Sequence, residues 1–222
     1  MPNWTFNHLK AKGLDSLPVF REVDGKRYFD FNKIIPIPDY VEKTIFPVNT
    51  QALACYLILN FGKDSKKIMK EYKLDDKIIN EKTLEEWEEF AKESTPGILF
   101  DDEAYITMYE LGENYYKSKL FTGCFDWYEW AIKNWGVKWN ASGFDCFDCN
   151  NEDETMFETP WDYPDPIYRE LALRYPDMYF DVFVEFEDDP YTTYHLEYHG
   201  EYMRETSYPN DKERYDYIDL IV

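Results

Sequence analysis

The segment MYFDVFVEFE, Met178–Glu187, decides the fold, because apolar and polar side chains alternate along its length. A period of two residues is typical of a β-strand with one buried face. The segment TYHLEYHGEYM at 193–203 alternates in the same way, and the linker EDDPYTT at 187–193 joins the two. Together these segments predict an antiparallel hairpin.

The alternation assigns each side chain of the predicted hairpin to one of two faces. The face expected in the core carries Met178, Phe180, Val182, Val184 and Phe186, followed by Tyr194, Leu196, Tyr198 and Tyr202. The opposite face carries Tyr179, Asp181, Phe183, Glu185 and Glu187, followed by His195, Glu197, His199 and Glu201. Carboxylates therefore concentrate on one side of both strands.

A helix is predicted directly before this hairpin, in DPIYRELALRYPD at 165–177. Asp165 is expected as its N-cap, Pro166 suits the first turn, and Pro176 stops the helix.

The tryptophan-rich stretch FDWYEWAIKNWGVKWNASGF at 125–144 predicts another helix. Its apolar stripe at helical spacing, widened by two further tryptophans, is formed by Tyr128, Ala131, Ile132 and Trp135 with Trp127 and Trp130. Gly136 stands where a left-handed cap is expected. This periodicity favours core packing over an exposed platform for nucleobases, because the surrounding acidic charge repels phosphate.

The first half of the chain predicts two strands and then several helices. Strands are expected at 3–13, ending at Gly13, and at 26–39, stopped by Pro36 and Pro38. The helical stretches are a buried helix at 49–62 ending at Gly62, a helix at 83–94 that opens with the capping box Thr83 and Glu86, and a helix at 101–112 ending at Gly112. The lysine-rich stretch 62–77 is expected to be a solvated helix or loop.

Strands mixed with helices on one face predict an α+β fold. The stretches MPNW, FDFNKIIPIPD at 29–39, WAIKNWGVKWNA at 130–141 and RYPDMYFDVFVEF at 174–186, with Pro160–Trp161, resemble the YubB-like ferredoxin-like family of small phage- and plasmid-encoded proteins. The resemblance implies a ferredoxin-like sandwich with a mostly antiparallel sheet and an origin on a mobile element, and it implies no chemistry. We expect one domain over 1–222 with a helical insertion at 41–120.

The net charge of −21 is concentrated in the second half of the chain. Residues 1–100 hold 16 acidic and 15 basic residues, whereas residues 101–222 hold 29 and 9. Such a surface repels nucleic acid and anionic membranes and attracts basic proteins. We therefore expect neither direct nucleic-acid binding nor membrane binding.

The sequence predicts a protein of the host-cell cytoplasm. No apolar run approaches the roughly 20 residues that span a bilayer. The segment MPNWTFNHLK lacks the apolar core of a signal peptide. The four cysteines, Cys55, Cys124, Cys146 and Cys149, are then expected to be reduced.

Motifs for metal binding and catalysis are weak. CFDC at Cys146–Cys149, with Cys124 and a histidine, is a candidate zinc site, but no second Cys-x-x-Cys accompanies it. His195 and His199 are four residues apart in a predicted strand, roughly 13 Å, which is too far for one ion. We expect surface histidines, no metal and no cofactor.

The sequence also lacks a phosphate-binding glycine loop, a nucleophile elbow and a catalytic Cys/His signature. We therefore expect no enzyme. Two alternatives stay open: an enzyme or zinc protein centred on Cys146 and Cys149, and an accessory structural protein without an inhibitory target.

The acidic strands suggest mimicry of nucleic acid. Carboxylates at i and i+2 of a strand lie about 6.6 Å apart, close to the roughly 6–7 Å between phosphates along one DNA strand. Solubility alone is the competing explanation, although like charges on neighbouring strands repel. We expect inhibition of a basic nucleic-acid-binding host protein, such as a CRISPR effector or restriction enzyme. The expected contact residues are Glu152, Asp153, Glu154, Asp181, Glu185, Glu187, Asp188, Asp189, Glu197 and Glu201.

Overall fold

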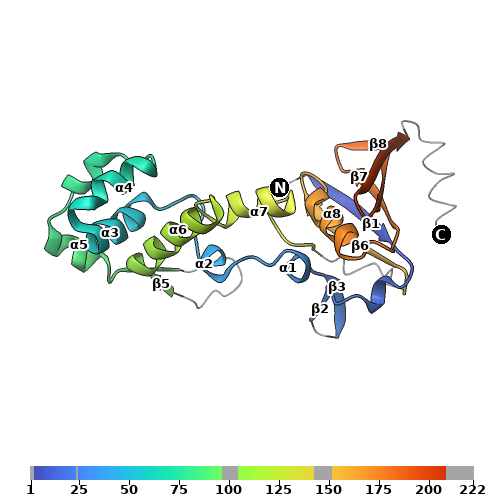
Figure 1. The fold of residues 1–222 in the computed structure, drawn as a ribbon, viewed down its shortest axis with the longest axis horizontal. Coiled ribbons are helices and arrows are strands. Elements are labelled where there is room, and N and C mark those ends of the chain that lie inside the picture. The colour runs from blue at the N-terminus through green and yellow to red at the C-terminus, as the bar shows by residue number, and fades with distance from the viewer. Residues whose placement is uncertain (1–2, 24, 97–104, 143–151, 209–222) are drawn as a thin grey trace. The chain divides into compact units, whose positions relative to one another are not determined.

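The computed structural model describes residues 3–23, 25–96, 105–142 and 152–208 (Figure 1). The chain divides into two compact units. Met1–Pro36 and Ala131–Val222 form the first, here called the sheet unit, and Ile37–Trp130 form the second, the helical unit. The predicted insertion, 41–120, falls inside the helical unit.

The sheet unit is built on a five-stranded sheet with the order β6-β1-β7-β8-β9. All neighbouring strands are antiparallel. The strands are β1 (Trp4–Lys10), β6 (Glu154–Pro160), β7 (Phe180–Phe186), β8 (Asp189–His199) and β9 (Tyr202–Tyr208). The predicted α+β sandwich with an antiparallel sheet is confirmed, as is the β7–β8 hairpin.

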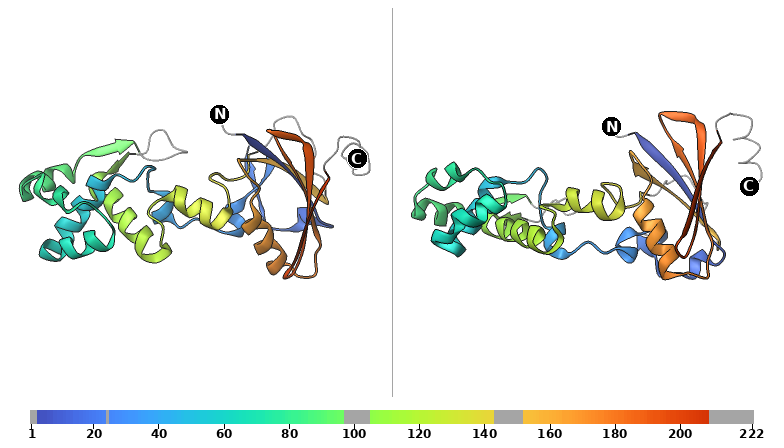
Figure 2. Two further views of the ribbon diagram at one scale, coloured as in Figure 1. Left: turned by 90° about the horizontal axis from the view of Figure 1, so that it is seen from above. Right: turned by 45° about the horizontal axis from the view of Figure 1, so that its top comes forward.

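Helices pack on one face of this sheet. Figure 2 shows α8 (Asp165–Arg174), coloured orange, lying along that face. Leu9, Val182 and Leu196 are opposite one another in β1, β7 and β8 and are fully buried there. The Tyr168 hydroxyl of α8 donates to Asn7 Oδ1 at 2.7 Å, so a buried polar contact fixes the helix to the sheet.

The predicted N-cap of α8 is wrong by one residue. Pro164 is the N-cap, and Asp165 is the first helical residue. The Asp165 carboxylate is engaged elsewhere, because it accepts bonds from the Tyr198 hydroxyl at 2.8 Å and from Arg169 Nε at 2.6 Å. The helix ends at Arg174, before Pro176, as predicted.

The tryptophan-rich stretch forms α7 (Trp127–Trp135), in which Trp130 and Trp135 are buried, as predicted, whereas Trp127 and Tyr128 are half-buried. Trp135 Nε1 donates to the carbonyl of Ile35 at 2.8 Å. Ile132 departs from the expected stripe, because 44% of it is exposed. Gly136 follows the helix with φ +83°, the left-handed conformation that glycine tolerates.

The predicted single strand at 26–39 is wrong. Instead β2 (Phe20–Val23) and β3 (Lys26–Phe29) form a hairpin, and α1 (Phe31–Ile34) follows at once. Asp30 causes the change, because its side chain accepts the backbone N–H of Asn32 and so caps a helix turn.

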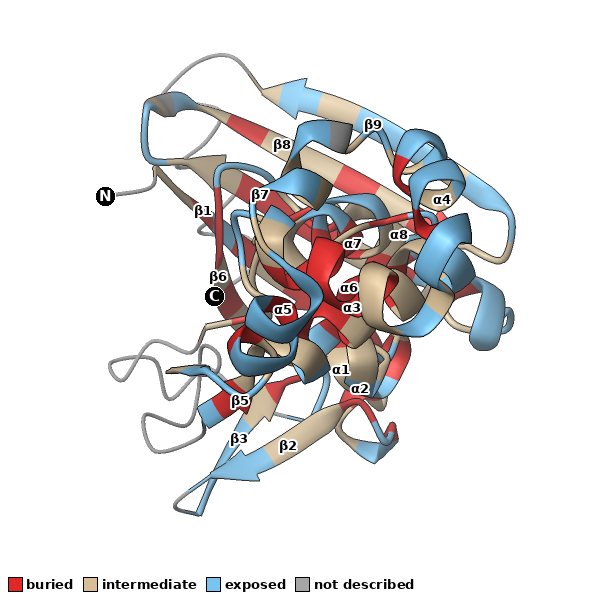
Figure 3. Ribbon diagram, turned by 90° about the vertical axis from the view of Figure 1, so that its left-hand side faces the viewer, coloured by how far each residue is buried: buried red, intermediate tan, exposed pale blue. Residues whose placement is uncertain are grey.

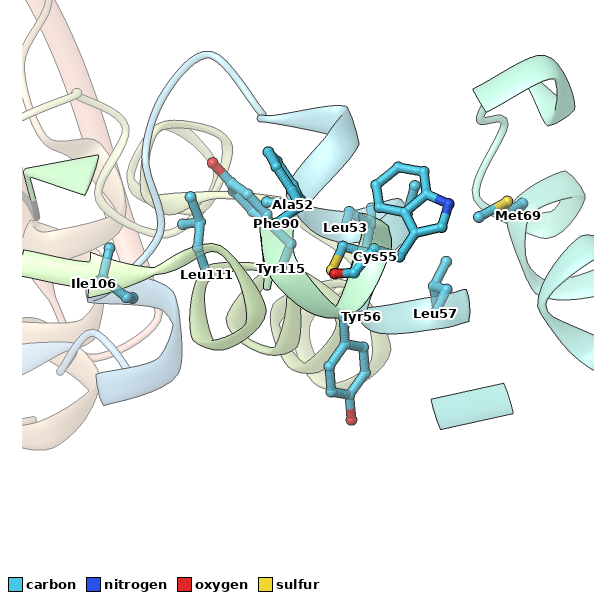
Figure 4. Close-up of a cluster of buried hydrophobic side chains, with 12 residues drawn as sticks. Ala52, Leu53, Cys55, Tyr56, Leu57, Met69, Phe90, Ile106, Leu111 and Tyr115 are labelled. Carbon is cyan, nitrogen blue, oxygen red and sulfur yellow. The ribbon is translucent and has the colours of Figure 1, made fainter. Parts of the chain in front are cut away.

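The helical unit has its core between α3 (Thr50–Phe61) and α6 (Met108–Thr122), where the buried residues gather (Figure 3). Leu53, Leu57 and Leu111 are fully buried in this cluster, which also contains Phe90 (Figure 4). Trp87 belongs to the same cluster. The other elements are α2 (Asp39–Glu42), η2 (Gly62–Asp64), α4 (Ser65–Glu71), η3 (Asp76–Asn80), α5 (Leu84–Phe90), β4 (Ser94–Pro96) and β5 (Tyr105–Thr107); the sheet unit adds η1 (Leu14–Ser16).

Two helix boundaries in this unit are confirmed. The helix α3 ends at Phe61 with Gly62 as its C-cap, and Thr83 with Glu86 forms the predicted capping box of α5. The lysine-rich stretch contains α4, whose Met69 is fully buried, so it is more than a solvated segment.

The helix predicted at 101–112 is wrong. Within the described residues, Tyr105–Thr107 form strand β5, and a capping box of Thr107 and Glu110 starts α6, which continues to Thr122. Gly112 lies inside α6 and does not end it. Glycine is required there because the absence of a side chain lets α6 approach α3 closely. A Cβ atom at Gly112 would overlap the carbonyl group of Ala52.

Candidate functional site

The candidate site is the face of the sheet opposite α8, here called the carboxylate face. Strand register places its side chains in rows that run across the strands. One row contains Glu154, Lys10, Asp181, Glu197 and Arg204. The row four residues along each strand contains Glu158, Phe6, Glu185, Thr193 and Tyr208.

Two of the predicted strand carboxylates are not in strands. The strand β7 ends at Phe186, with a register shift at Glu185, so Glu187 lies in the turn before β8. The strand β8 ends at His199, and Gly200, with φ +56°, turns the chain at Glu201 into β9. The shared faces predicted for Glu187 and Glu201 are therefore wrong.

The structure places the predicted acidic residues at two ends of the sheet rather than in one array. The end at Trp4, where β1 begins, carries Glu158, which was not predicted, together with Glu185, Glu187, Asp188 and Asp189. The end at Lys10, where β1 finishes, carries Glu152, Asp153, Glu154, Asp181, Glu197 and Glu201.

Carboxylates are crowded at the Trp4 end. Glu187 Oε2 accepts the backbone N–H of Trp4 at 2.8 Å, and Asp188 Oδ2 accepts Asn3 Nδ2 at 3.0 Å. These bonds fix the β7–β8 turn against the start of β1. Burial, with a smaller contribution from the charge of Glu187, raises the pKa of Glu158 above its usual range.

At the Lys10 end, cations stand between the acids. Lys10 Nζ lies 3.1 Å from Glu154 Oε2, and Arg204 Nε lies 3.6 Å from Glu197 Oε2. Basic residues therefore offset part of the acidic charge at this end of the face. The cations come from β1 and β9, which the hairpin sequence does not contain. Asp153 has a structural role, since its Oδ1 accepts the backbone N–H of Gly13 at 2.6 Å.

A third row of side chains lies between the row of Lys10 and the row of Phe6. In it, His8 and His195 flank Phe183. The His195 ring stacks on Phe183 with centroids 4.5 Å apart, and its Nε2 lies 3.0 Å from Asp181 Oδ1. On the other side, His8 Nε2 lies 2.8 Å from Glu154 Oε2. Burial lowers the pKa of His8, and the hydrogen bond to Glu154 partly offsets that effect. His195, with 15% of its side chain exposed, is not the surface histidine that we expected.

His199 lies apart from these two, and its ring stacks on Tyr179 at 3.9 Å. The structure instead brings Asp181, His195 and Glu197 together, with one potential ligand atom from each lying within 4.8 Å of the others. The spacing of histidines along one strand does not reveal this group, because its members come from two strands. The hairpin register would have placed Asp181 opposite Glu197.

Two of the four cysteines lie in the described part of the chain. Cys55 and Cys124 are buried free thiols, and burial raises the pKa of Cys55 to about 11. That direction keeps the Cys55 thiol protonated and unreactive at neutral pH. Cys146 and Cys149 lie outside the described residues.

Comparison with known proteins gives little. No family model matches the chain, and no curated protein matches it. A solved structure, the protein api92 from Yersinia pseudotuberculosis with the family model DUF1281, aligns over 94% of this chain and 98% of its own, at 12% identity and a TM-score of 0.40. A likeness at this level carries no argument about function. None of the helices in the described ranges is long and apolar enough to cross a membrane.

Proposed function

We propose that the protein is a non-enzymatic inhibitor that docks its carboxylate face on a basic, nucleic-acid-binding host protein. The observation that carries the proposal is the row of Glu154, Asp181 and Glu197, with Glu158 and Glu185 four residues along the same strands. Five carboxylates held by one sheet form a rigid pattern of negative charge, which a surface built to bind phosphates recognises.

The position of these carboxylates on strands favours binding over solubility alone. Backbone pairing spaces them about 13 Å apart along a strand and about 4.8 Å apart between the adjacent strands of Asp181 and Glu197. The spacing is about twice the latter where β1 lies between β6 and β7. Bringing carboxylates together on a sheet costs free energy of folding. At the Trp4 end, burial is the larger cause of the raised pKa of Glu158, and the charge of Glu187 adds a smaller part.

The ion pairs of Lys10 and Arg204 make the two ends of the carboxylate face differ in negative charge. They offset part of the charge at the Lys10 end, so the Trp4 end presents the more negative surface. We propose that the Trp4 end supplies the main electrostatic attraction and that the Lys10 end sets the orientation of the partner.

The setting of the proposed function rests on the family resemblance. A protein of the YubB-like type, carried by a phage or plasmid and acting in the host cytoplasm, meets defence nucleases whose nucleic-acid channels are basic. The target class that we propose is therefore a defence nuclease, such as a CRISPR effector or a restriction enzyme.

Matched neutralisation tests the proposal. Glu158→Gln, Glu185→Gln and Asp181→Asn together remove three charges from the carboxylate face and keep the side-chain shapes. Glu85→Gln, Glu88→Gln and Glu89→Gln remove the same number from exposed positions of α5. Partners captured from a bacterial lysate should be lost with the first set, retained with the second, and displaced from the unchanged protein by added duplex DNA. Equal capture by both sets would contradict the proposal.

A further inference from the structure

Asp181 and Glu197 are directly opposite each other in the β7–β8 pair. Like charges in this position destabilise an antiparallel pair. His195, two residues before Glu197, projects to the same face, with Nε2 at 3.0 Å from Asp181 Oδ1. Each of the three side chains offers a potential ligand atom, and these atoms lie within 4.8 Å of one another.

We propose that Asp181, His195 and Glu197 bind a divalent transition-metal ion of the zinc type. One imidazole nitrogen and two carboxylate oxygens are ligands that zinc accepts, whereas magnesium and calcium prefer oxygen ligands throughout. Three protein ligands leave a position for water, so the site is of the open kind rather than the closed structural kind. This inference does not depend on the proposed inhibitory function.

The geometry needs a small adjustment to hold an ion. Ligand atoms about 2.1 Å from a tetrahedral zinc ion lie about 3.4 Å from one another. The two carboxylates have room to rotate, because 47% of the Asp181 side chain and 33% of the Glu197 side chain are exposed. Their backbone positions are fixed by the strand pairing, so rotation about side-chain bonds brings the ligands together.

Neighbouring residues orient these ligands. Phe183 stacks on the His195 ring with an interplanar angle of 18°, which holds the plane of the imidazole. Arg204 lies 3.6 Å from Glu197 Oε2 and directs that carboxylate. Lys10 is opposite Asp181 in the register, but its ammonium pairs with Glu154 at 3.1 Å, so Glu154 offsets its repulsion of a metal ion.

The carboxylate face contains a second histidine–carboxylate pair, His8 and Glu154, which lacks a third ligand. His8 Nε2 lies 2.8 Å from Glu154 Oε2, just as His195 lies beside Asp181. In that pair Lys10 occupies the place that Glu197 takes beside Asp181. The His8 pair therefore offers two ligand side chains instead of three, so His8 provides an internal control.

Calorimetric titration of the reduced full-length protein with zinc chloride, and visible absorption with cobalt chloride, test the site. We expect one ion per chain. His195→Gln and Glu197→Gln should each weaken binding at least about tenfold, whereas His8→Gln should leave it unchanged. Circular dichroism shows whether each variant folds. Glu197→Gln, at a partly exposed position, decides the test if His195→Gln does not fold.

Cysteine thiolates also bind zinc, so the titrations need a variant that lacks Cys146 and Cys149. All titrations are repeated with Cys146→Ser and Cys149→Ser combined, so that a thiolate site is removed. One-to-one binding that persists in this background and is lost with His195→Gln or Glu197→Gln supports the proposal. Absence of binding, loss of binding in the serine background, or equal binding by the Glu197→Gln variant overturns it.

Discussion

The Tyr198 hydroxyl in β8 donates a hydrogen bond to Asp165 Oδ1 at 2.8 Å, which ties the sheet to the first turn of α8. Tyr198 is buried, so its replacement by phenylalanine leaves the Asp165 oxygen without this donor. We expect Tyr198→Phe to lower the free energy of unfolding by about 1–2 kcal/mol, measured by urea denaturation. Tyr191→Phe, at an exposed position of the same strand, should change it little.

A second prediction concerns the approach of α6 to α3. A methyl group at Gly112 would overlap the carbonyl group of Ala52, so the helices would have to separate. We expect Gly112→Ala to destabilise the protein by about 1–3 kcal/mol, although alanine is the better helix former. Thermal unfolding measures the loss. Glu113→Ala in the same helix is the control, and an equal loss there would show that close packing at Gly112 is not the cause.

The buried His8 predicts a pH dependence of stability. Its pKa is lowered in the folded state, so the unfolded state binds more protons as the pH falls through the ordinary value near 6.5. The stability due to neutral His8 is present above that pH and is lost as the pH falls toward the lowered pKa. In that window the slope is smaller than the limit of about 1.4 kcal/mol per pH unit for one whole proton.

Denaturation of the His8→Gln variant at several pH values checks this sign. The variant should show a smaller loss of stability than the unchanged protein below pH 6.5. His199→Gln serves as the control. If both variants followed the pH profile of the unchanged protein, His8 would not be the titrating group.

Asp126 predicts a pH dependence of stability opposite in sign to that of His8. It is buried, its Oδ1 accepts the backbone N–H of Glu129 at 2.9 Å, and burial raises its pKa. A carboxyl with a raised folded pKa lowers stability at neutral pH, and that penalty disappears as the pH falls through the raised pKa to the unfolded value. Asp126→Asn keeps an acceptor for the N–H of Glu129. It should therefore have a higher Tm at pH 7, and the difference should shrink in acid.

Local chemistry explains how much of the fold was predictable. Alternation predicted β7 and β8, because each side chain there faces either core or the opposite face. The end of α3 followed from Gly62 and the start of α5 from Thr83, since caps act within a few residues. Gly112 misled the prediction, because its reason for being glycine is the backbone of Ala52, 60 positions earlier in the sequence.

The candidate site was predicted by residue type but not by arrangement. Acidic residues on β7 and β8 were found from the sequence, whereas their partners Lys10 and Arg204 come from β1 and β9 through strand pairing. Gly200 and Glu201 between alternating runs form a two-residue hairpin signal, which would have revealed β9. The Asp181, His195 and Glu197 group needed the cross-strand register, which no single segment contains.

The measurement that tests the central claim most directly is a pull-down with the tagged protein from a bacterial lysate that contains defence systems, washed first at low salt and then at 1 M salt. Docking through the carboxylate face predicts a nucleic-acid-binding protein that is retained at low salt and released at 1 M, where the Debye length falls to about 3 Å. A partner retained at 1 M salt, or no partner at either salt, would contradict the claim.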